Sequence, residues 1–159
     1  MNTAVLRIAL LLTLTAAFAA CKDPESLSKV PSIGFVSLEP RVVKAASSED
    51  TVFLEFRFSD GDADLGVPSS SGEYDVFLTD SRDSTVRQFL FPEIADELRD
   101  PVKGMTGTAV LILDAALLLP RDSLHTITGD TLHYEVYVRD QAGHESNRFT
   151  TPDIILTPP

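Results

Sequence analysis

The chain has 159 residues, a formal net charge of −11 and a sequence pI of about 4.5. This acidity argues against binding to nucleic-acid phosphates and against electrostatic attraction to anionic lipid. Cys21 is the single cysteine, so a disulfide within the chain is excluded. The length suits one domain that buries a core of its own.

The first residues have the composition of a secretory leader. Residues 1–7 end in the positive charge of Arg7, and residues 8–20 form an apolar run of about 13 residues, shorter than the roughly 20 that span a membrane. The sequence Phe18-Ala19-Ala20-Cys21 resembles the lipobox of bacterial lipoproteins, with Phe18 in place of the usual Leu. The resemblance implies cleavage after Ala20 and a lipid anchor, with palmitate-type acyl chains, on Cys21. The alternative is an ordinary secretory leader with an incidental cysteine.

These features divide the chain into a signal peptide over residues 1–20, a lipidated tether over residues 21–31 and a globular domain over residues 32–159. Residues 22–31 are mostly polar and predict a spacer between bilayer and domain. Because the chain is acidic, membrane attachment is expected from the acyl chains, and stable anchoring takes more than one. Lys22 follows Cys21; by resemblance to the sorting rules of Gram-negative lipoproteins, the absence of Asp there favours the outer membrane. The expected location is the cell envelope, facing the periplasm or the cell surface.

The domain has the periodicity of β-strands. Apolar and polar residues alternate clearly over residues 51–59, where Phe53 breaks the pattern, and over residues 132–139. Such alternation indicates strands with one buried and one wet face. Turn-forming clusters separate the apolar segments, which favours a sandwich. The seven predicted strands are residues 33–38, 51–59, 74–79, 86–91, 108–113, 132–139 and 148–156.

Two segments have helix-like signals. Residues 92–99 begin with Pro92 followed by an acidic residue, a typical helix start. Residues 114–119 predict one helical turn, capped by Asp114 and stopped by Pro120. Both segments are expected to cross between the sheets.

Three segments resemble parts of immunoglobulin-like and cadherin-like modules. Residues 130–136, with Tyr134, resemble the tyrosine corner of immunoglobulin-like domains, in which the tyrosine hydroxyl bonds to nearby backbone. Residues 139–147 resemble the D-x-x-G turn between strands F and G, and residues 58–66 resemble the turn after strand B. The resemblance implies an all-β fold, an immunoglobulin-like antiparallel β-sandwich of about seven strands. Small envelope lipoproteins of Gram-negative bacteria have similar elements.

An acidic loop is the candidate ligand site. Asp60, Asp62 and Asp64 alternate over five residues and would repel one another unless solvated or bound to a shared cation. Position six from Asp60 is Leu65 rather than Gly, so the loop is not an EF-hand. If residues 51–59 and 132–139 are strands B and F, Asp140 approaches the same end of the sandwich. Four carboxylates there could hold calcium, whose preferred ligands are oxygens; the alternative is a set of solvated, self-capped turns.

No catalytic constellation is visible. His125 is expected in a loop, His133 on a wet strand face and His144 in a turn, without metal-ligand spacing. No nucleophile elbow or phosphate-binding glycine loop occurs. Four phenylalanines could place aromatic rings on an outward face, although core packing explains most of them. They are Phe53, Phe77, Phe89 and Phe91.

The sequence therefore predicts a lipid-anchored, non-enzymatic binding or structural module of the cell envelope, with calcium as a candidate stabilising ion. Its expected partners are the membrane, through the lipid, and envelope proteins or glycans, but no nucleic acid. The alternative is an enzyme, or an accessory subunit of one, that acts on envelope or extracellular polymers. A third interpretation is an assembly factor that pairs an uncovered strand edge, at residues 86–91 or 148–156, with a partner.

Overall fold

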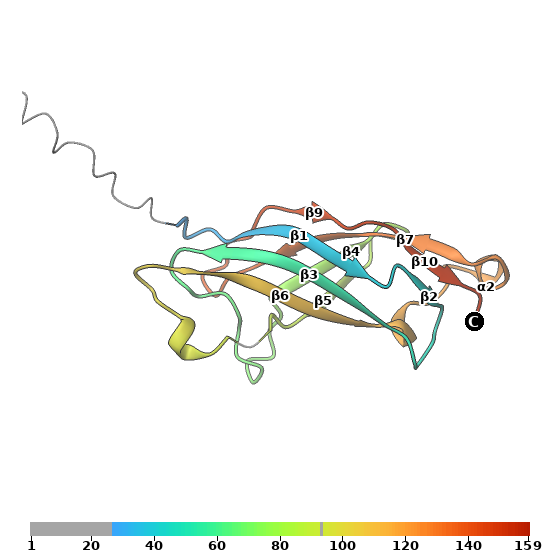
Figure 1. Ribbon diagram of the computed structural model, residues 1–159, viewed down its shortest axis with the longest axis horizontal. Helices are drawn as coiled ribbons and strands as arrows, with labels where there is room; N and C mark the ends of the chain where they lie inside the picture. Colours follow the sequence, from blue (N-terminus) through green and yellow to red (C-terminus); the bar gives the residue numbers. More distant parts are fainter. Residues whose placement is uncertain (1–26, 93) are drawn as a thin grey trace, which may run out of the picture.

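The computed structural model describes residues 27–92 and 94–159, which form ten strands in three sheets (Figure 1). The leader and the lipidation site Cys21 lie outside these residues. The first sheet has the order β1-β3-β6, and its strands are antiparallel. Strands β3 and β6 pair in unbroken register over ten residues each. The bounds are β1 (Ser32–Glu39), β3 (Thr51–Asp60) and β6 (Met105–Asp114).

The second sheet packs against the first and has the order β5-β4-β8-β9. Its pairs are all antiparallel, with β4 and β8 at the centre. Strands β5 and β9 at its edges are short, with four and two residues. The bounds are β4 (Val76–Asp80), β5 (Val86–Phe89), β8 (Tyr134–Val138) and β9 (Phe149–Thr150).

A small third sheet lies at one end of the molecule and has the order β2-β10-β7. Strand β10 is antiparallel to β7 but parallel to β2, which differs from the wholly antiparallel sandwich that the sequence predicts. Strand β2 was not among the predicted strands; three residues are too few to establish an alternation. The bounds are β2 (Val42–Lys44), β7 (Asp130–Leu132) and β10 (Ile154–Thr157).

The core lies between the two larger sheets and is filled by the alternate residues that the sequence assigns to it. Val52, Leu54 and Phe56 of β3 are fully buried, whereas Phe53 between them is exposed. The inward-facing side chains of the segment 132–139 are buried to the same extent. They are Leu132, Tyr134, Val136 and Val138. The sandwich-like all-β fold is therefore confirmed.

The predicted strand over residues 132–139 is divided at His133. Its backbone N–H donates to Ser81 Oγ at 3.0 Å, and its carbonyl accepts from Ser81 N at 3.0 Å. Ser81 therefore takes the groups that a sheet ladder would use, and the chain passes from the third sheet into the second. The inward–outward alternation continues through the change, so periodicity alone could not reveal it.

The predicted strand over residues 148–156 is also divided, into β9 and β10. Pro152 lies between them and has no N–H to donate to a ladder. Thr151 just before it bonds across to Tyr134 through both backbone N–H and side-chain Oγ1, at 2.9 Å each. These bonds hold the connection against β8 while the chain changes sheets.

Helical structure is limited to short segments. Residues 114–119 contain the predicted turn, a 3-10 helix η3 (Ala115–Leu117) whose N-terminus is capped by the Asp114 carboxylate at 2.8 Å from Ala116 N. The helix predicted over residues 92–99 is reduced to η2 (Asp96–Leu98). An α-helix that was not predicted, α2 (Ser123–Thr128), places His125 on a helix rather than in a loop. Within the described ranges, no helix combines the length and apolar character needed to cross a bilayer.

Tyr134 departs from the tyrosine corner that its sequence context resembles. Its side chain is fully buried, but its hydroxyl has no hydrogen-bond partner among the described residues. Burial raises the pKa of this hydroxyl to about 12. The residue therefore fills core space without the backbone bond that the resemblance implies.

Candidate functional site

Asp60 ends strand β3 and organises the loop that follows it. One carboxylate oxygen, Oδ2, accepts from the backbone N–H of Asp64 at 2.9 Å and of Leu65 at 3.0 Å. The side chain is fully buried, and its second oxygen, Oδ1, has no hydrogen-bond partner among the residues that the structure describes. Ala63 adopts a positive φ of 60° within this turn. The Asp60 carboxylate thus fixes the loop over residues 61–65 and leaves one buried oxygen free.

The loop after β8 meets this first loop through Asp64. The Asp64 Oδ2 atom accepts from Ala142 N at 3.2 Å, and the Asp64 carbonyl accepts from Gln141 N at 3.3 Å. Asp140, which precedes these two residues, is buried. Its carboxylate accepts from His144 N at 2.7 Å and contacts His144 Nδ1 at 2.8 Å. Two loops far apart in the sequence are thereby joined by acidic side chains.

Three carboxylates converge where the loops meet. One oxygen each from Asp60, Asp64 and Asp140 lies within 4.8 Å of the others. Two oxygens that each lie about 2.4 Å from a calcium ion can be no more than about 4.8 Å apart, so this spacing fits one shared ion. Asp62 is not part of this group of three, and its Oδ2 lies 3.7 Å from the exposed Lys29 Nζ. Within the described part of the chain, its Oδ1 is nevertheless buried without a hydrogen-bond partner, as is Asp64 Oδ1.

Burial and the neighbouring carboxylates disfavour the ionised forms of Asp60 and Asp64. Desolvation, followed by the charges of Asp64 and Asp62, raises the pKa of Asp60 to about 6 against the effect of its two backbone bonds. Desolvation, then Asp140 and Asp62, also raises the pKa of Asp64. The Asp140 carboxylate raises the pKa of His144 through their hydrogen bond. Any positive charge brought into this cluster would stabilise the ionised carboxylates.

Long polar side chains hold the acidic loop from outside. Arg99 Nη1 donates to the carbonyls of Ala63 at 3.1 Å and Leu65 at 2.7 Å. Gln141 Nε2 donates to the Gly66 carbonyl at 3.0 Å. The carbonyls of Ala63, Leu65 and Gly66 are therefore occupied by hydrogen bonds from Arg99 and Gln141.

The N-terminal described segment packs on this same end of the sandwich. The Ser28 carbonyl accepts from Gly61 N at 2.7 Å, between Asp60 and Asp62. A side chain on Gly61 would collide with the Leu27 carbonyl, so glycine permits this close approach. Leu27 also lies against Gly104, which precedes β6. The chain therefore joins the domain beside the acidic cluster, at the end opposite α2 and the third sheet (Figure 1).

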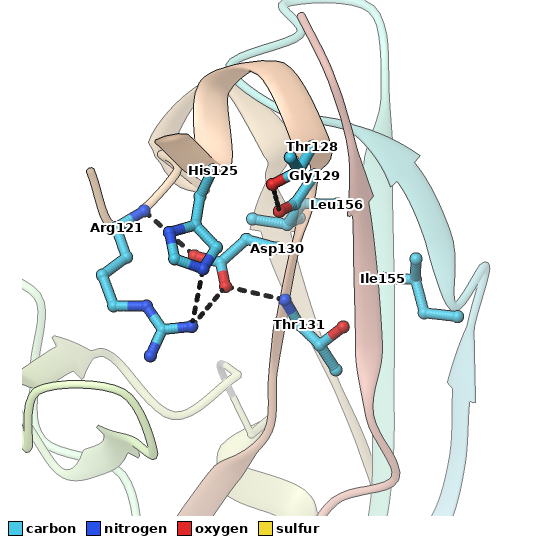
Figure 2. Close-up of a pocket in the computed structure, with 8 residues that line it drawn as sticks. All are labelled: Arg121, His125, Thr128, Gly129, Asp130, Thr131, Ile155 and Leu156. Carbon is cyan, nitrogen blue, oxygen red and sulfur yellow. Dashed lines mark hydrogen bonds and ion pairs between the residues drawn. The ribbon is translucent and has the colours of Figure 1, made fainter. Parts of the chain in front are cut away.

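The opposite end has a pocket of about 350 Å³ between α2, β7 and β10 (Figure 2). Asp130 is the acidic residue in its lining. The Asp130 carboxylate accepts from Arg121 N at 2.9 Å, Arg121 Nη2 at 3.0 Å, Thr131 N at 2.9 Å and Arg82 Nη1 at 2.9 Å. Figure 2 shows the Arg121 side chain reaching across to it, with His125 Nε2 at 3.2 Å from Arg121 Nη2. Four donors leave this carboxylate no free lone pair with which to act as a base.

A buried ion-pair network keeps the pKa of Asp130 low. Burial works to raise the pKa of Asp130, but the bonds from Arg121, Thr131 and Arg82 outweigh it and lower the pKa to about 2. Arg82 bridges Asp130 at 2.9 Å and Asp80 at 2.7 Å. Its guanidinium also donates to the Leu119 carbonyl at 2.8 Å. The arrangement ties β7 of the third sheet, and the segment that follows η3, to β4.

The larger cavities contain few ionisable groups. One of about 730 Å³ lies between residues 66–70 and 90–94, and its ionisable lining residue among those described is Arg99. The four phenylalanines do not form one outward patch: Phe91 packs against Phe56 and Phe58 in the core, and Phe77 stacks on Tyr137 at 4.7 Å. Two arginines cover the outer sides of that stacked pair. They are Arg139 over Phe77 and Arg148 over Tyr137.

The sequence predicts that Asp60, Asp62, Asp64 and Asp140 gather at one end of the sandwich. The structure brings oxygens of three of them together, those of Asp60, Asp64 and Asp140. His144 was not assigned a role, yet it makes two contacts with Asp140. The spacing Asp-x-x-x-His within a tight turn is the signal that could have indicated this contact. Arg99 carried no comparable signal, because it lies 33 residues or more from the loop that it holds.

Comparison with known proteins assigns no family to this chain. No protein-family model matches this chain, and no match was found among curated proteins or solved structures. The functional argument therefore rests on the residues and their geometry.

Proposed function

We propose that this chain is a lipid-anchored protein of the cell envelope that acts as a non-enzymatic binding or structural module, with its acidic end facing the membrane. The observation that carries the proposal is the packing of residues 27–30 beside the acidic cluster. Cys21 lies six residues before Leu27. Six residues span at most about 20 Å when fully extended, so a lipid on Cys21 would keep this end close to the bilayer.

The other end of the sandwich would then point away from the membrane. Elements at that end expose large apolar side chains, which a soluble domain rarely gathers without an interaction partner. Leu124 and Ile127 project from α2, and Val42 pairs with Ile155 across β2 and β10. An envelope protein or a glycan that contacts this end would meet a surface held at a fixed distance from the lipid.

An immunoglobulin-like arrangement is part of the proposal. Strands β1, β3 and β6 correspond in order to strands A, B and E of such domains, and β4, β8 and β9 correspond to C, F and G. This fold usually presents loops for binding at its two ends, but the fold itself does not specify a function. The saturated carboxylate of Asp130 in the far pocket supports a non-enzymatic role.

Labelling with a palmitate analogue tests the anchor. The full chain, expressed in a Gram-negative host, is expected to incorporate the label and to fractionate with membranes. Cys21→Ser removes the acceptor sulfur and is expected to abolish both, whereas the neighbouring substitution Lys22→Ala retains both. Label or membrane association retained by Cys21→Ser would contradict the proposal.

Site-specific photo-crosslinking tests the orientation. A photoreactive residue at Ile127 is expected to capture an envelope component in intact cells, and one at Ser70, near the acidic end, is expected to capture lipid or nothing. Equal capture of the same component from both positions would argue against a binding surface at the far end.

A further inference from the structure

Three of the loop carboxylates have buried oxygens that nothing in the described chain satisfies. These are the Oδ1 atoms of Asp60, Asp62 and Asp64. A buried acceptor without a donor is destabilising, and more so when it is charged. Native proteins leave few such groups without a partner, and the carboxylates of an ordinary acidic turn are exposed to water. Asp60 is the extreme case, because its side chain is fully buried and directed into the cluster.

The donors present nearby do not remove this deficit. Lys29 contacts the other oxygen of Asp62, at 3.7 Å, and its side chain is 76% exposed. His144 contacts Asp140, whose two oxygens it uses. The backbone donors of Asp64, Leu65 and Ala142 all go to Oδ2 atoms. The described residues therefore supply no donor to these Oδ1 atoms, and the fully buried Asp60 belongs to the group of three carboxylates whose oxygens lie close enough to share one cation.

The donor set selects the kind of ion. Carboxylate oxygens without thiolate ligands suit hard cations, and calcium accepts six to eight oxygens at about 2.3–2.6 Å with flexible geometry. Three carboxylates, each binding through one or two oxygens, supply three to six of them. Magnesium demands near-ideal octahedral geometry, which an irregular set of carboxylates from two loops meets less readily.

We propose that Asp60, Asp64 and Asp140 bind one calcium ion, with Asp62 adding negative charge beside it. The ion would join the end of β3, the loop over residues 61–65 and the loop over residues 140–144, and so connect the two larger sheets at one end. It would also rigidify the loop on which Ser28 and Lys29 pack. The site uses residues of the domain alone and does not depend on lipidation of Cys21.

Calorimetry and thermal unfolding of the full chain, purified in detergent, test the site. Calcium chloride is titrated at pH 7.5 and constant ionic strength, against chelator and against magnesium chloride. We expect one calcium per chain and a rise in Tm on the order of 10 °C at a hundredfold excess over the dissociation constant. Magnesium is expected to bind at least tenfold more weakly.

Three variants complete the test. Asp60→Asn and Asp64→Asn keep acceptors for the backbone N–H groups and remove one negative charge each, so both are expected to fold without calcium but to lose at least tenfold in calcium affinity. Glu49→Gln removes one charge from an exposed position outside the cluster and is expected to bind as the parent chain does. Absence of calcium binding to the folded parent chain, equal response to magnesium, or an unchanged response in Asp64→Asn would overturn the proposal.

Discussion

Arg82 and Asp130 illustrate, at the scale of single residues, how this acidic chain uses buried charge. Their side chains are almost fully buried, and each is bonded on several sides. Such pairs add little net stability over an apolar core, but removal of one partner leaves the other charge uncompensated. The network is therefore a sensitive point of the fold although it has no direct part in the proposed site.

Stability in acid is expected to depend on Asp130. The hydrogen bonds that it accepts lower its folded pKa to about 2, below its ordinary value of 3.8. A lowered folded pKa contributes stability that is present above pH 4 and is lost as the pH falls from about 4 to 2; here the loss is roughly 2 kcal/mol. Urea unfolding at pH 5, 4, 3 and 2 measures this loss.

The variant Asp130→Asn provides the matched comparison. It is expected to lower the free energy of unfolding at pH 7 by about 3 kcal/mol, because Arg82 loses a charged partner, and to remove Asp130's share of the acid-dependent decline. The surface substitution Asp153→Asn, which breaks an exposed contact with His133, should change stability by less than about 0.5 kcal/mol. Equal effects of the two substitutions would contradict this account.

Single residues also mark the limit of what the sequence could predict about the site. The alternation of Asp60, Asp62 and Asp64 indicated an acidic turn, and the assignment of strands B and F indicated the approach of Asp140. The burial of the Asp60 side chain could not be predicted, because burial depends on packing between segments far apart in the sequence. The sequence thus predicted which charges would meet but not which oxygens would lack partners.

Among the elements, β6 is an edge strand with little protection. Residues 105–113 contain no charge and no proline, and their pairing with β3 has no bulge. In the described residues β6 pairs only with β3. By contrast, β1 has a bulge, and Asn147 bonds both backbone groups of Ile33. Natural edges usually carry such protection because a free edge can pair with another chain.

Weak self-association through β6 is therefore expected at high protein concentration. Ile112 is 61% exposed and lies beside Phe53 on the neighbouring strand, so the open edge adjoins apolar surface. Ile112→Lys adds a charge to this surface and should reduce self-association while changing the free energy of unfolding by less than about 1 kcal/mol. Sedimentation velocity over a concentration series measures the effect, with Thr131→Lys on β7 as the control. Self-association that Ile112→Lys leaves unchanged would exclude this edge.

The elements were predicted to different degrees, for identifiable reasons. All seven predicted strand segments contain strands, because burial of one face leaves a period of two in the sequence. The edges first suggested for strand pairing proved short, since β5 has four residues and β9 two. Helix α2 was missed although Asp122 caps its start and Gly129 its end. Six residues without a buried side chain gave no hydrophobic period to support those caps.

For the whole molecule, the segment over residues 27–30 connects the tether to the sandwich. Deletion of residues 22–30 from the mature chain is expected to lower the free energy of unfolding by about 1–2 kcal/mol, since Gly61 N loses its acceptor, the Ser28 carbonyl. The same deletion should weaken calcium binding, because it releases the loop that carries Asp60 and Asp62. Urea unfolding with and without calcium measures both. Deletion of residues 22–26 alone should have neither effect, and an equal loss from the shorter deletion would contradict the role of residues 27–30.

The parallel pairing of β2 with β10 has a consequence for folding kinetics. Its partners are separated by more than a hundred residues, as the bond from Thr157 Oγ1 to the Val43 carbonyl shows. Pairings of such high sequence separation are slow to form, because the entropy of closing a long loop must be overcome before any contact is gained. The small third sheet cannot assemble until residues 154–157 have been synthesised and released. The two larger sheets use no residue beyond Thr150, so they can form first, and the pairing of β10 is then the last step that closes this end of the domain.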